Sequence, residues 1–106
     1  MALERQREMK RIMKRGKTMP TLSMFYGIIV RMYAEKGGKH NLPHIHASYG
    51  GVEIVVDLDG NTIEGGMSKG KLKLLLAWIE IHREELMANW QLLLEGEPAF
   101  KIKPLD

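Results

Sequence analysis

The chain has 106 residues, of which 44% are hydrophobic and 27% charged, and it contains no cysteine. This length allows one domain with a small core, and the lack of cysteine excludes disulfides and thiolate metal sites. No apolar run approaches the roughly 20 residues of a membrane-spanning helix, and the basic N-terminus lacks the apolar segment of a secretory signal. A cytoplasmic protein without membrane contact is therefore expected.

Positive charge is concentrated at the N-terminus. Residues 1–20 hold seven Lys or Arg and two Glu, whereas the remaining residues hold nine Lys or Arg and eleven Asp or Glu. The net charge of +3 is therefore +5 in the first part and −2 in the rest. We interpret residues 1–18 as a basic extension, flexible or a short helix, that is either solvated or in contact with nucleic acid. Residues 19–106 are interpreted as a single α+β domain; a translation start at Met19 is another reading.

Strands come first in the domain. Residues 25–35 are rich in β-branched and aromatic side chains without a helical period, which is typical of a strand. Residues 44–49 and 52–58 are predicted as the second and third strands. An Asp-Gly turn signal after them lets residues 61–66 continue as a short fourth strand. The sequence therefore predicts an antiparallel meander of three to four strands.

One long helix follows the strands. Ser68 suits its N-cap, apolar residues then recur at helical spacing for about 27 residues, and Gly96 suits the first position beyond its end. Residues 99–106 form an alternating tail that can add one edge strand. The predicted fold class is α+β, with one long C-terminal helix packed on one face of the meander and a basic N-terminal arm.

The Gly50-Gly51 pair predicts a two-residue hairpin, because both central residues of a type I′ turn need positive φ, which glycine adopts freely. This turn fixes the strand pairing, and the pleat then sorts the side chains into two faces. The apolar face, expected against the helix, holds Ile45, Ala47, Tyr49, Val52, Ile54 and Val56. The opposed pairs are Tyr49–Val52, Ser48–Glu53, Ala47–Ile54, His46–Val55, Ile45–Val56 and His44–Asp57.

The other face is the candidate binding site, and it is expected to be solvated. In the alignment chosen for the first strand, it holds Arg31, Tyr33, His44, His46, Glu53 and Asp57. His44 opposite Asp57 places the two Cβ atoms about 5 Å apart, so we expect a hydrogen bond that raises the histidine pKa above about 6.5. Such a histidine can be an acid, a base or an anion contact, or the pair can be an ordinary surface contact.

Two further uses of the histidines stay open. A small ribonuclease-like enzyme would exchange protons through His44 and His46, beside Asp57, while Arg31 stabilises a phosphorane. A metal-binding structural module would use His44, His46 and Asp57, because His-x-His on a strand directs both rings to one side. This pattern is weak and offers no definite fourth ligand, so no metal or other cofactor is expected.

The helix carries two apolar strips. The main strip is expected to pack on the sheet and comprises Leu72, Leu75, Leu76, Ile79, Leu86, Trp90, Leu93 and Leu94. The second strip, off to one side, comprises Leu74, Trp78 and Ile81. It needs a cover from the arm, from the tail or, as we favour, from another subunit or protein partner, for example in a homodimer. Arg83 projects into the main strip and is expected to pair with Glu53, Asp57 or a C-terminal group, or to bind an anion.

Four sequence blocks match one family in order. They read MPTLSMFYGIIVRMY from Met19, LPHIHASYG from Leu42, EIVVDLDG from Glu53 and WIEIHREELMANWQLLLEGEP from Trp78. Together they resemble the small bacterial proteins of the domain of unknown function 4160 family. Members usually read Pro-Pro-His-Phe-His-Ala where this chain has residues 42–47, and they start at the Met-Pro that matches Met19-Pro20. His44, His46 and Arg83 fall on family motif positions.

The resemblance implies a short stand-alone bacterial protein, often encoded beside another small protein in an arrangement like that of toxin–antitoxin gene pairs. It implies no catalytic residue. The expected function is regulatory binding of a protein partner or nucleic acid, with the ribonuclease-like enzyme and the metal-binding module as alternatives. Because residues 21–106 are slightly acidic, a nucleic-acid contact is expected through residues 1–18 and not through the folded body.

Overall fold

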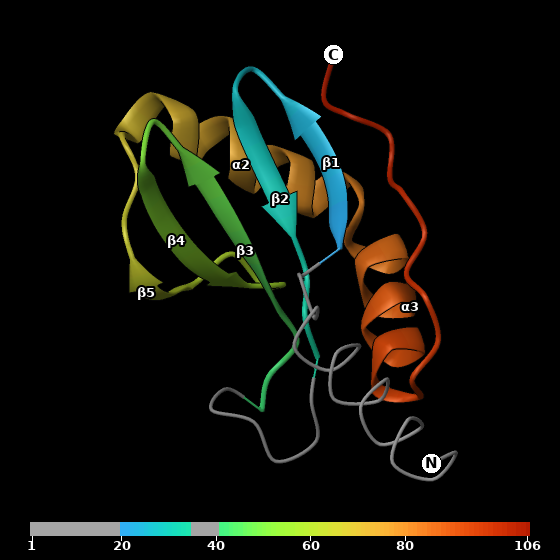
Figure 1. Cartoon of the computed structure of the whole chain (residues 1–106). Helices are drawn as coiled ribbons and strands as arrows, with labels where there is room; N and C mark the ends of the chain where they lie inside the picture. Colours follow the sequence, from blue (N-terminus) through green and yellow to red (C-terminus); the bar gives the residue numbers. More distant parts are fainter. Residues whose placement is uncertain (1–19, 35–40) are drawn as a thin grey trace, which may run out of the picture.

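The computed structural model describes residues 20–34 and 41–106, so the predictions for residues 1–18 lie outside the described part. The strands are β1 (Thr21–Phe25), β2 (Ile28–Arg31), β3 (His44–Tyr49), β4 (Val52–Asp57) and β5 (Thr62–Gly65), and the helices are α2 (Lys69–Ile81) and α3 (Arg83–Leu94). The strands form one antiparallel meander in the order β1-β2-β3-β4-β5, and the helices lie against the sheet (Figure 1). The α+β class is confirmed, but the described chain has five strands instead of three or four and two helices instead of one.

The predicted strand at residues 25–35 contains a turn. Tyr26 (φ 49°) and Gly27 (φ 82°) both have positive φ, and Phe25 pairs with Ile28 across them. These angles are those of a tight type I′ hairpin turn, so β1 and β2 form a hairpin. The prediction was wrong because a bulky residue such as tyrosine seldom adopts positive φ, and the β-forming composition continues through the turn.

The hairpin predicted at Gly50-Gly51 is confirmed. Both glycines have positive φ, 57° and 85°, and all six predicted pairs from Tyr49–Val52 to His44–Asp57 are present. Four residues of the apolar face are at most 1% exposed, namely Ile45, Ala47, Ile54 and Val56, whereas Val52, predicted on the same face, is 50% exposed beside the turn. The proposed short fourth strand is also present as β5, which pairs with β4.

The helix predicted to be continuous breaks at His82. The backbone of this residue (φ −108°, ψ 21°) still donates to the Trp78 carbonyl and accepts from the Leu86 amide, so it closes α2 and opens α3. Its Nδ1 lies 2.5 Å from Oε1 of Glu85, one turn into α3. No glycine or proline marks the break, and the apolar period runs through it, which is why the sequence predicts one helix. Neither described helix is long and apolar enough to cross a membrane.

The end of α3 follows the prediction. Gly96 has a φ of 79°, its amide donates to the Leu93 carbonyl, and the Glu97 amide donates to the Leu92 carbonyl. This pair of bonds is the Schellman arrangement that ends many helices at a glycine. The chain then turns back and runs beside α3 and β1 (Figure 1).

The C-terminal segment, residues 97–106, is held without forming a strand. Asn89 of α3 donates through Nδ2 to the Phe100 carbonyl at 2.8 Å and accepts from the Phe100 amide at 2.9 Å. Further along, the Ile102 amide donates to the Leu22 carbonyl of β1 at 2.9 Å. The predicted edge strand is therefore replaced by one backbone bond to β1 and two side-chain bonds to α3.

This segment covers Trp78, one residue of the second apolar strip. Trp78 is 0% exposed, and its Nε1 donates to the Lys103 carbonyl at 2.8 Å. The same chain therefore covers Trp78 itself, and a partner or homodimer contact through the rest of this strip stays a prediction. Ile81, from the same strip, stays 64% exposed. In the main strip Leu75, Ile79, Leu86 and Trp90 are buried, as predicted.

Candidate functional site

A row of side chains crosses the face opposite Ile45 and Ala47, which we call the polar face. Arg31 of β2 pairs with His46 of β3, His46 with Val55 of β4, and Val55 with Glu64 of β5. Directly paired residues place their side chains on the same face of a sheet, so the alignment of Arg31 with the histidines is confirmed. The face is drier than expected, because Val55 is only 4% exposed.

His44 lies on this row's side of the sheet but is buried, at 5% exposure. Its ring centroid is 5.0 Å from that of Trp90 in α3 and 5.3 Å from that of His46. Its Nδ1 is 2.7 Å from the Leu42 carbonyl, and since a carbonyl only accepts, this nitrogen carries a proton. The prediction of a solvated His44 was wrong, because the Trp90 side chain packs on the ring.

Asp57 faces His44 in the pairing, but its carboxylate turns to the β4–β5 turn. Oδ1 accepts from the amides of Asp59 and Asn61, each at 2.9 Å, and Oδ2 accepts from Asn61 Nδ2 at 3.2 Å. Partial burial raises the pKa of Asp57, but the hydrogen bonds from Asn61, Asp59 and Gly60 outweigh it, and the net effect lowers the pKa. The predicted hydrogen bond to His44 is therefore replaced by bonds that close the turn.

His46 is the half-buried member of the pair. Its side chain is 16% exposed, and its Nδ1 lies 3.7 Å from Oε1 of Glu53, whose side chain is 62% exposed. That distance is too long for a hydrogen bond, and Nδ1 is a buried atom without a hydrogen-bond partner. Buried polar atoms normally have a partner, so leaving this nitrogen unpaired costs the fold some stability.

A shallow hollow of about 350 Å³ opens beside His46, near the β3–β4 turn. Its lining combines the charges of Arg31 and Glu53, the Ser48 hydroxyl, and apolar surface from Ile29 and Val52. The backbone of both hairpin turns completes the wall. Of the predicted binding residues, Arg31 and Glu53 thus line one accessible depression, and His46 lies next to both of them.

The model of the domain of unknown function DUF4160 matches residues 27–91, more than half of the chain. The chain belongs to this family. No significant match is found among the curated proteins or among the solved structures. The DUF4160 match begins at the β1–β2 turn and ends inside α3, so it includes the polar face and excludes the Leu22–Ile102 contact.

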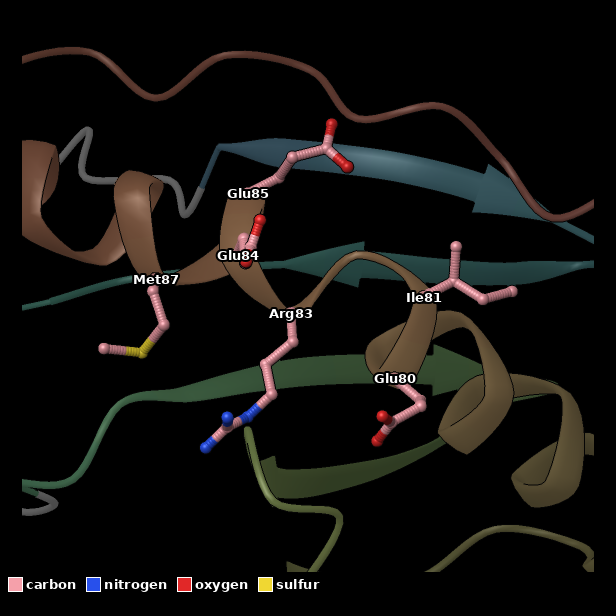
Figure 2. A pocket seen from close by; sticks show the side chains of 6 residues that line it. All are labelled: Glu80, Ile81, Arg83, Glu84, Glu85 and Met87. Atoms are coloured by element: carbon pink, nitrogen blue, oxygen red, sulfur yellow. The ribbon is translucent and has the colours of Figure 1, made fainter.

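Arg83 of this DUF4160 chain lies away from the polar face. Its Nε donates to the Leu58 carbonyl at 3.1 Å, and its Nη2 donates to Oδ1 of Asp59 at 2.5 Å. The break at His82 turns Arg83 out of the main strip, and Figure 2 shows its side chain leaving the helices toward the β4–β5 end of the sheet. The expected carboxylate partner exists, but it is Asp59 instead of Glu53 or Asp57.

The metal-ligand candidates do not converge in this DUF4160 chain. Within residues 20–34 and 41–106, no group of three or more His, Asp or Glu is placed to hold a metal ion. Asp57 binds Asn61 and Asp59, and Nδ1 of His44 is bonded to a backbone carbonyl. Tyr33, a further predicted binding residue, follows β2, is half-buried and does not line the hollow near His46.

Sequence reasoning missed three residues that shape the DUF4160 polar face. Ser48 was already in the predicted register opposite Glu53, so its place in the hollow could have been found by treating hydroxyls as binding groups. Asn61 follows Asp57 at the spacing of a turn-closing side chain, which is a second usable signal. Trp90 could not be found, because its contact with His44 depends on the path of α3 after the break.

Proposed function

We propose that this chain is a small cytoplasmic regulatory protein that binds a protein partner through the polar face, as one member of a gene pair that resembles toxin–antitoxin pairs. The observation that supports this is the hollow lined by Arg31, Ser48 and Glu53. It brings both signs of charge, a hydroxyl and apolar surface together on an accessible face. Protein interfaces combine these features, and opposite charges give specificity for one partner.

The state of the would-be catalytic groups also favours binding. Asp57 is occupied by the β4–β5 turn, and His44 is buried against Trp90. A substrate has little access to the buried His44 ring, and both carboxylate oxygens of Asp57 already accept hydrogen bonds from the turn. Arg31 and Glu53, by contrast, lie on the accessible surface of the hollow, where Glu53 is 62% exposed and only approaches His46 at 3.7 Å, so both can pair with charges on a partner.

The test is co-expression with the neighbouring small protein, followed by calorimetric measurement of the dissociation constant. Arg31→Glu is expected to weaken the complex at least about tenfold, because reversing a charge inside a complementary interface replaces attraction with repulsion. Lys73→Glu is the matched control, because it also replaces a positive side chain by a negative one. Lys73 is exposed on α2 and lies outside the hollow. Equal binding by wild type and the Arg31→Glu variant would refute the polar-face contact, and no complex at all would refute the gene-pair proposal.

Ribonuclease-like catalysis is the second candidate. The observation in its favour is the 5.3 Å separation of the His44 and His46 rings, with Arg31 paired to His46. An RNA-cleavage assay compares wild type with His46→Gln and His44→Ala, and circular dichroism of each variant verifies folding. Metal-independent cleavage that falls at least about a hundredfold in both variants supports catalysis. Equal activity in all three proteins, or none, removes this candidate.

Nucleic-acid binding through residues 1–18 stays a prediction about a segment outside the described residues. Their seven Lys or Arg and two Glu are suited to phosphate contacts. Deleting residues 1–18 should lower the affinity for RNA and flatten the dependence of that affinity on salt. An unchanged salt slope would assign the contact to the folded body.

A further inference from the structure

A second depression, larger than the one on the polar face, lies at the helix break. It has a volume of about 580 Å³ and is lined by Glu80, Ile81, Arg83, Glu84, Glu85 and Met87. We call it the break groove. Figure 2 shows Arg83 passing between Met87 and Glu80, while Glu85 points to the opposite side, toward β1. The groove exists because α2 and α3 are separate helices.

The net charge of the break groove is negative once its internal pairs are counted. Arg83 is bonded to Asp59, and Glu85 is bonded to His82. Glu80 and Glu84 are exposed and make no hydrogen bond or ion pair with any residue in the described ranges. Two carboxylates are therefore available to an incoming positive charge.

The groove also carries apolar surface that the fold leaves uncovered. Ile81 is 64% exposed and Met87 is 42% exposed. They flank the break on the α2 and α3 sides, next to Glu80 and Glu84. A combined apolar and acidic surface is complementary to a segment that is both apolar and basic.

The sequence of this chain contains one such segment. Residues 1–18 hold seven Lys or Arg and two Glu, and their apolar residues Met9, Ile12 and Met13 recur at helical spacing. Lys10 and Lys14 are four positions apart, as are Glu80 and Glu84. No comparably basic stretch occurs in the remainder of the chain, whose net charge is −2.

We propose that the break groove binds the basic N-terminal segment, residues 1–18, of a second copy of this chain. Exchange of the segment between two copies gives a closed, symmetric dimer in which each groove is occupied, so one dimer contains the contact twice. The two contacts reinforce each other, because the second forms within an existing complex. This inference goes beyond the proposed function, since it concerns neither the polar face nor the neighbouring gene product.

The test is sedimentation velocity of the full chain over a range of concentrations, at about 0.05 M and about 0.5 M salt, between which the screening length falls severalfold. Wild type is expected to dimerise more weakly at the higher salt. Glu80→Lys with Glu84→Lys, or Lys10→Glu with Lys14→Glu, should each raise the dimer dissociation constant at least about tenfold. Combining all four changes should restore it to within about threefold of wild type, because the charges again match.

Glu95→Lys with Glu97→Lys is the matched control, since it reverses two exposed carboxylates at the far end of α3, outside the groove. It should leave the dissociation constant within about twofold of wild type. Any of four results would overturn the proposal: a monomer at every concentration, a dimer insensitive to both reversals, a control as damaging as the groove variant, or no recovery in the fourfold variant. Each is distinct from a failure of the polar-face test, which uses Arg31.

Discussion

The two tight hairpins of the sheet have the same backbone geometry but reach it differently. In the β3–β4 hairpin, Gly50 and Gly51 have positive φ, and added Cβ atoms would meet nothing within 4 Å. In the β1–β2 hairpin, Tyr26 takes the first position and Gly27 the second. A Cβ on Gly27 would lie 2.9 Å from Cε1 of Tyr49. One turn therefore sits in open space, and the other sits against the neighbouring strand.

The difference shows where each turn gets its stability. Glycine makes the β3–β4 turn favourable by itself. Tyr26 makes the β1–β2 turn locally unfavourable, and contacts from distant residues offset this cost. Lys71 of α2 donates to the Tyr26 carbonyl at 2.9 Å, and Ile102 bonds to β1 through Leu22. We therefore expect the β1–β2 hairpin to depend on tertiary structure much more than the β3–β4 hairpin does.

The largest effect should come from releasing the C-terminal segment. Asn89 is 0% exposed and bonded to both backbone groups of Phe100, so Asn89→Ala leaves buried polar groups without partners. We expect a loss of about 2–4 kcal/mol in the free energy of unfolding, measured by urea denaturation. Hydrogen exchange should accelerate in β1 more than in β4. Gln91→Ala is the control at an exposed position two residues on, and it should cost less than about 0.5 kcal/mol. Equal acceleration of exchange across the whole sheet would contradict the idea that the β1–β2 hairpin depends more on the C-terminal segment than the β3–β4 hairpin does.

The next effect compares glycines in the two turns. Gly27→Ala should cost about 2 kcal/mol, since alanine there meets both left-handed strain and the Tyr49 ring, whereas Gly50→Ala should cost about 1 kcal/mol from strain alone. Thermal and urea unfolding of both variants measure this difference. In a Tyr49→Ala background the two costs should converge, because the ring is gone. Equal costs in the wild-type background would mean that the ring moves aside freely.

A smaller effect concerns pH and the turn that follows β4. Hydrogen bonds in the folded state lower the pKa of Asp57 below its ordinary value of 3.8. A carboxyl whose pKa is lower when folded stabilises the protein above its unfolded pKa, and this stabilisation is lost as pH falls through the folded pKa. Stability measured by urea unfolding should thus decline below pH 3.8, and Asp57→Asn should flatten that decline. A variant with the same acid profile as wild type would show that other carboxyls dominate it.

The smallest expected effect is a gain. Asparagine tolerates positive φ better than tyrosine, and Tyr26 is 52% exposed, so little packing is lost when it is replaced. Tyr26→Asn should therefore stabilise the chain by roughly 0.5 kcal/mol, seen as a higher urea midpoint. Val52→Asn, at an exposed position beside the other turn, is the control and should show no gain. A destabilised Tyr26→Asn variant would show that the tyrosine ring stabilises the turn.

Sequence alone predicted the features of the fold that depend on residues close to one another along the chain. The Gly50-Gly51 turn determines the register of β3 and β4, and the pleat then determines the faces, which is why every predicted pair is present. Gly96 marks a helix end through its local backbone preference, and Ser68 lies at the expected N-cap position of α2, although its side chain makes no capping hydrogen bond. Each of these signals operates within a few residues, so tertiary structure did not change its outcome.

Most of the errors involve distant contacts, whereas the missing His44–Asp57 bond has a local cause in Asp59 and Asn61. The β1–β2 turn depends on α2 and the C-terminal segment, and the break at His82 accompanies contacts of Arg83 with Leu58 and Asp59. The cover of Trp78 is a stretch without regular secondary structure, which leaves no periodic pattern to recognise. For the site, the faces of Arg31 and His46 were predictable, whereas the burial of His44 was not, because it depends on the direction of α3.

The bond between Ile102 and Leu22 has a consequence for how the protein is made. The first described strand and the last described residues must meet before the edge of the sheet is closed. A ribosome synthesises β1 long before it reaches residue 102, so the nascent chain presents an open strand edge during that interval. The Trp78 indole is uncovered as well from the time residue 78 is made. A chain that ends before the C-terminal segment would keep the β1 edge and the Trp78 indole exposed permanently. Such fragments are expected to be bound by chaperones or degraded by proteases.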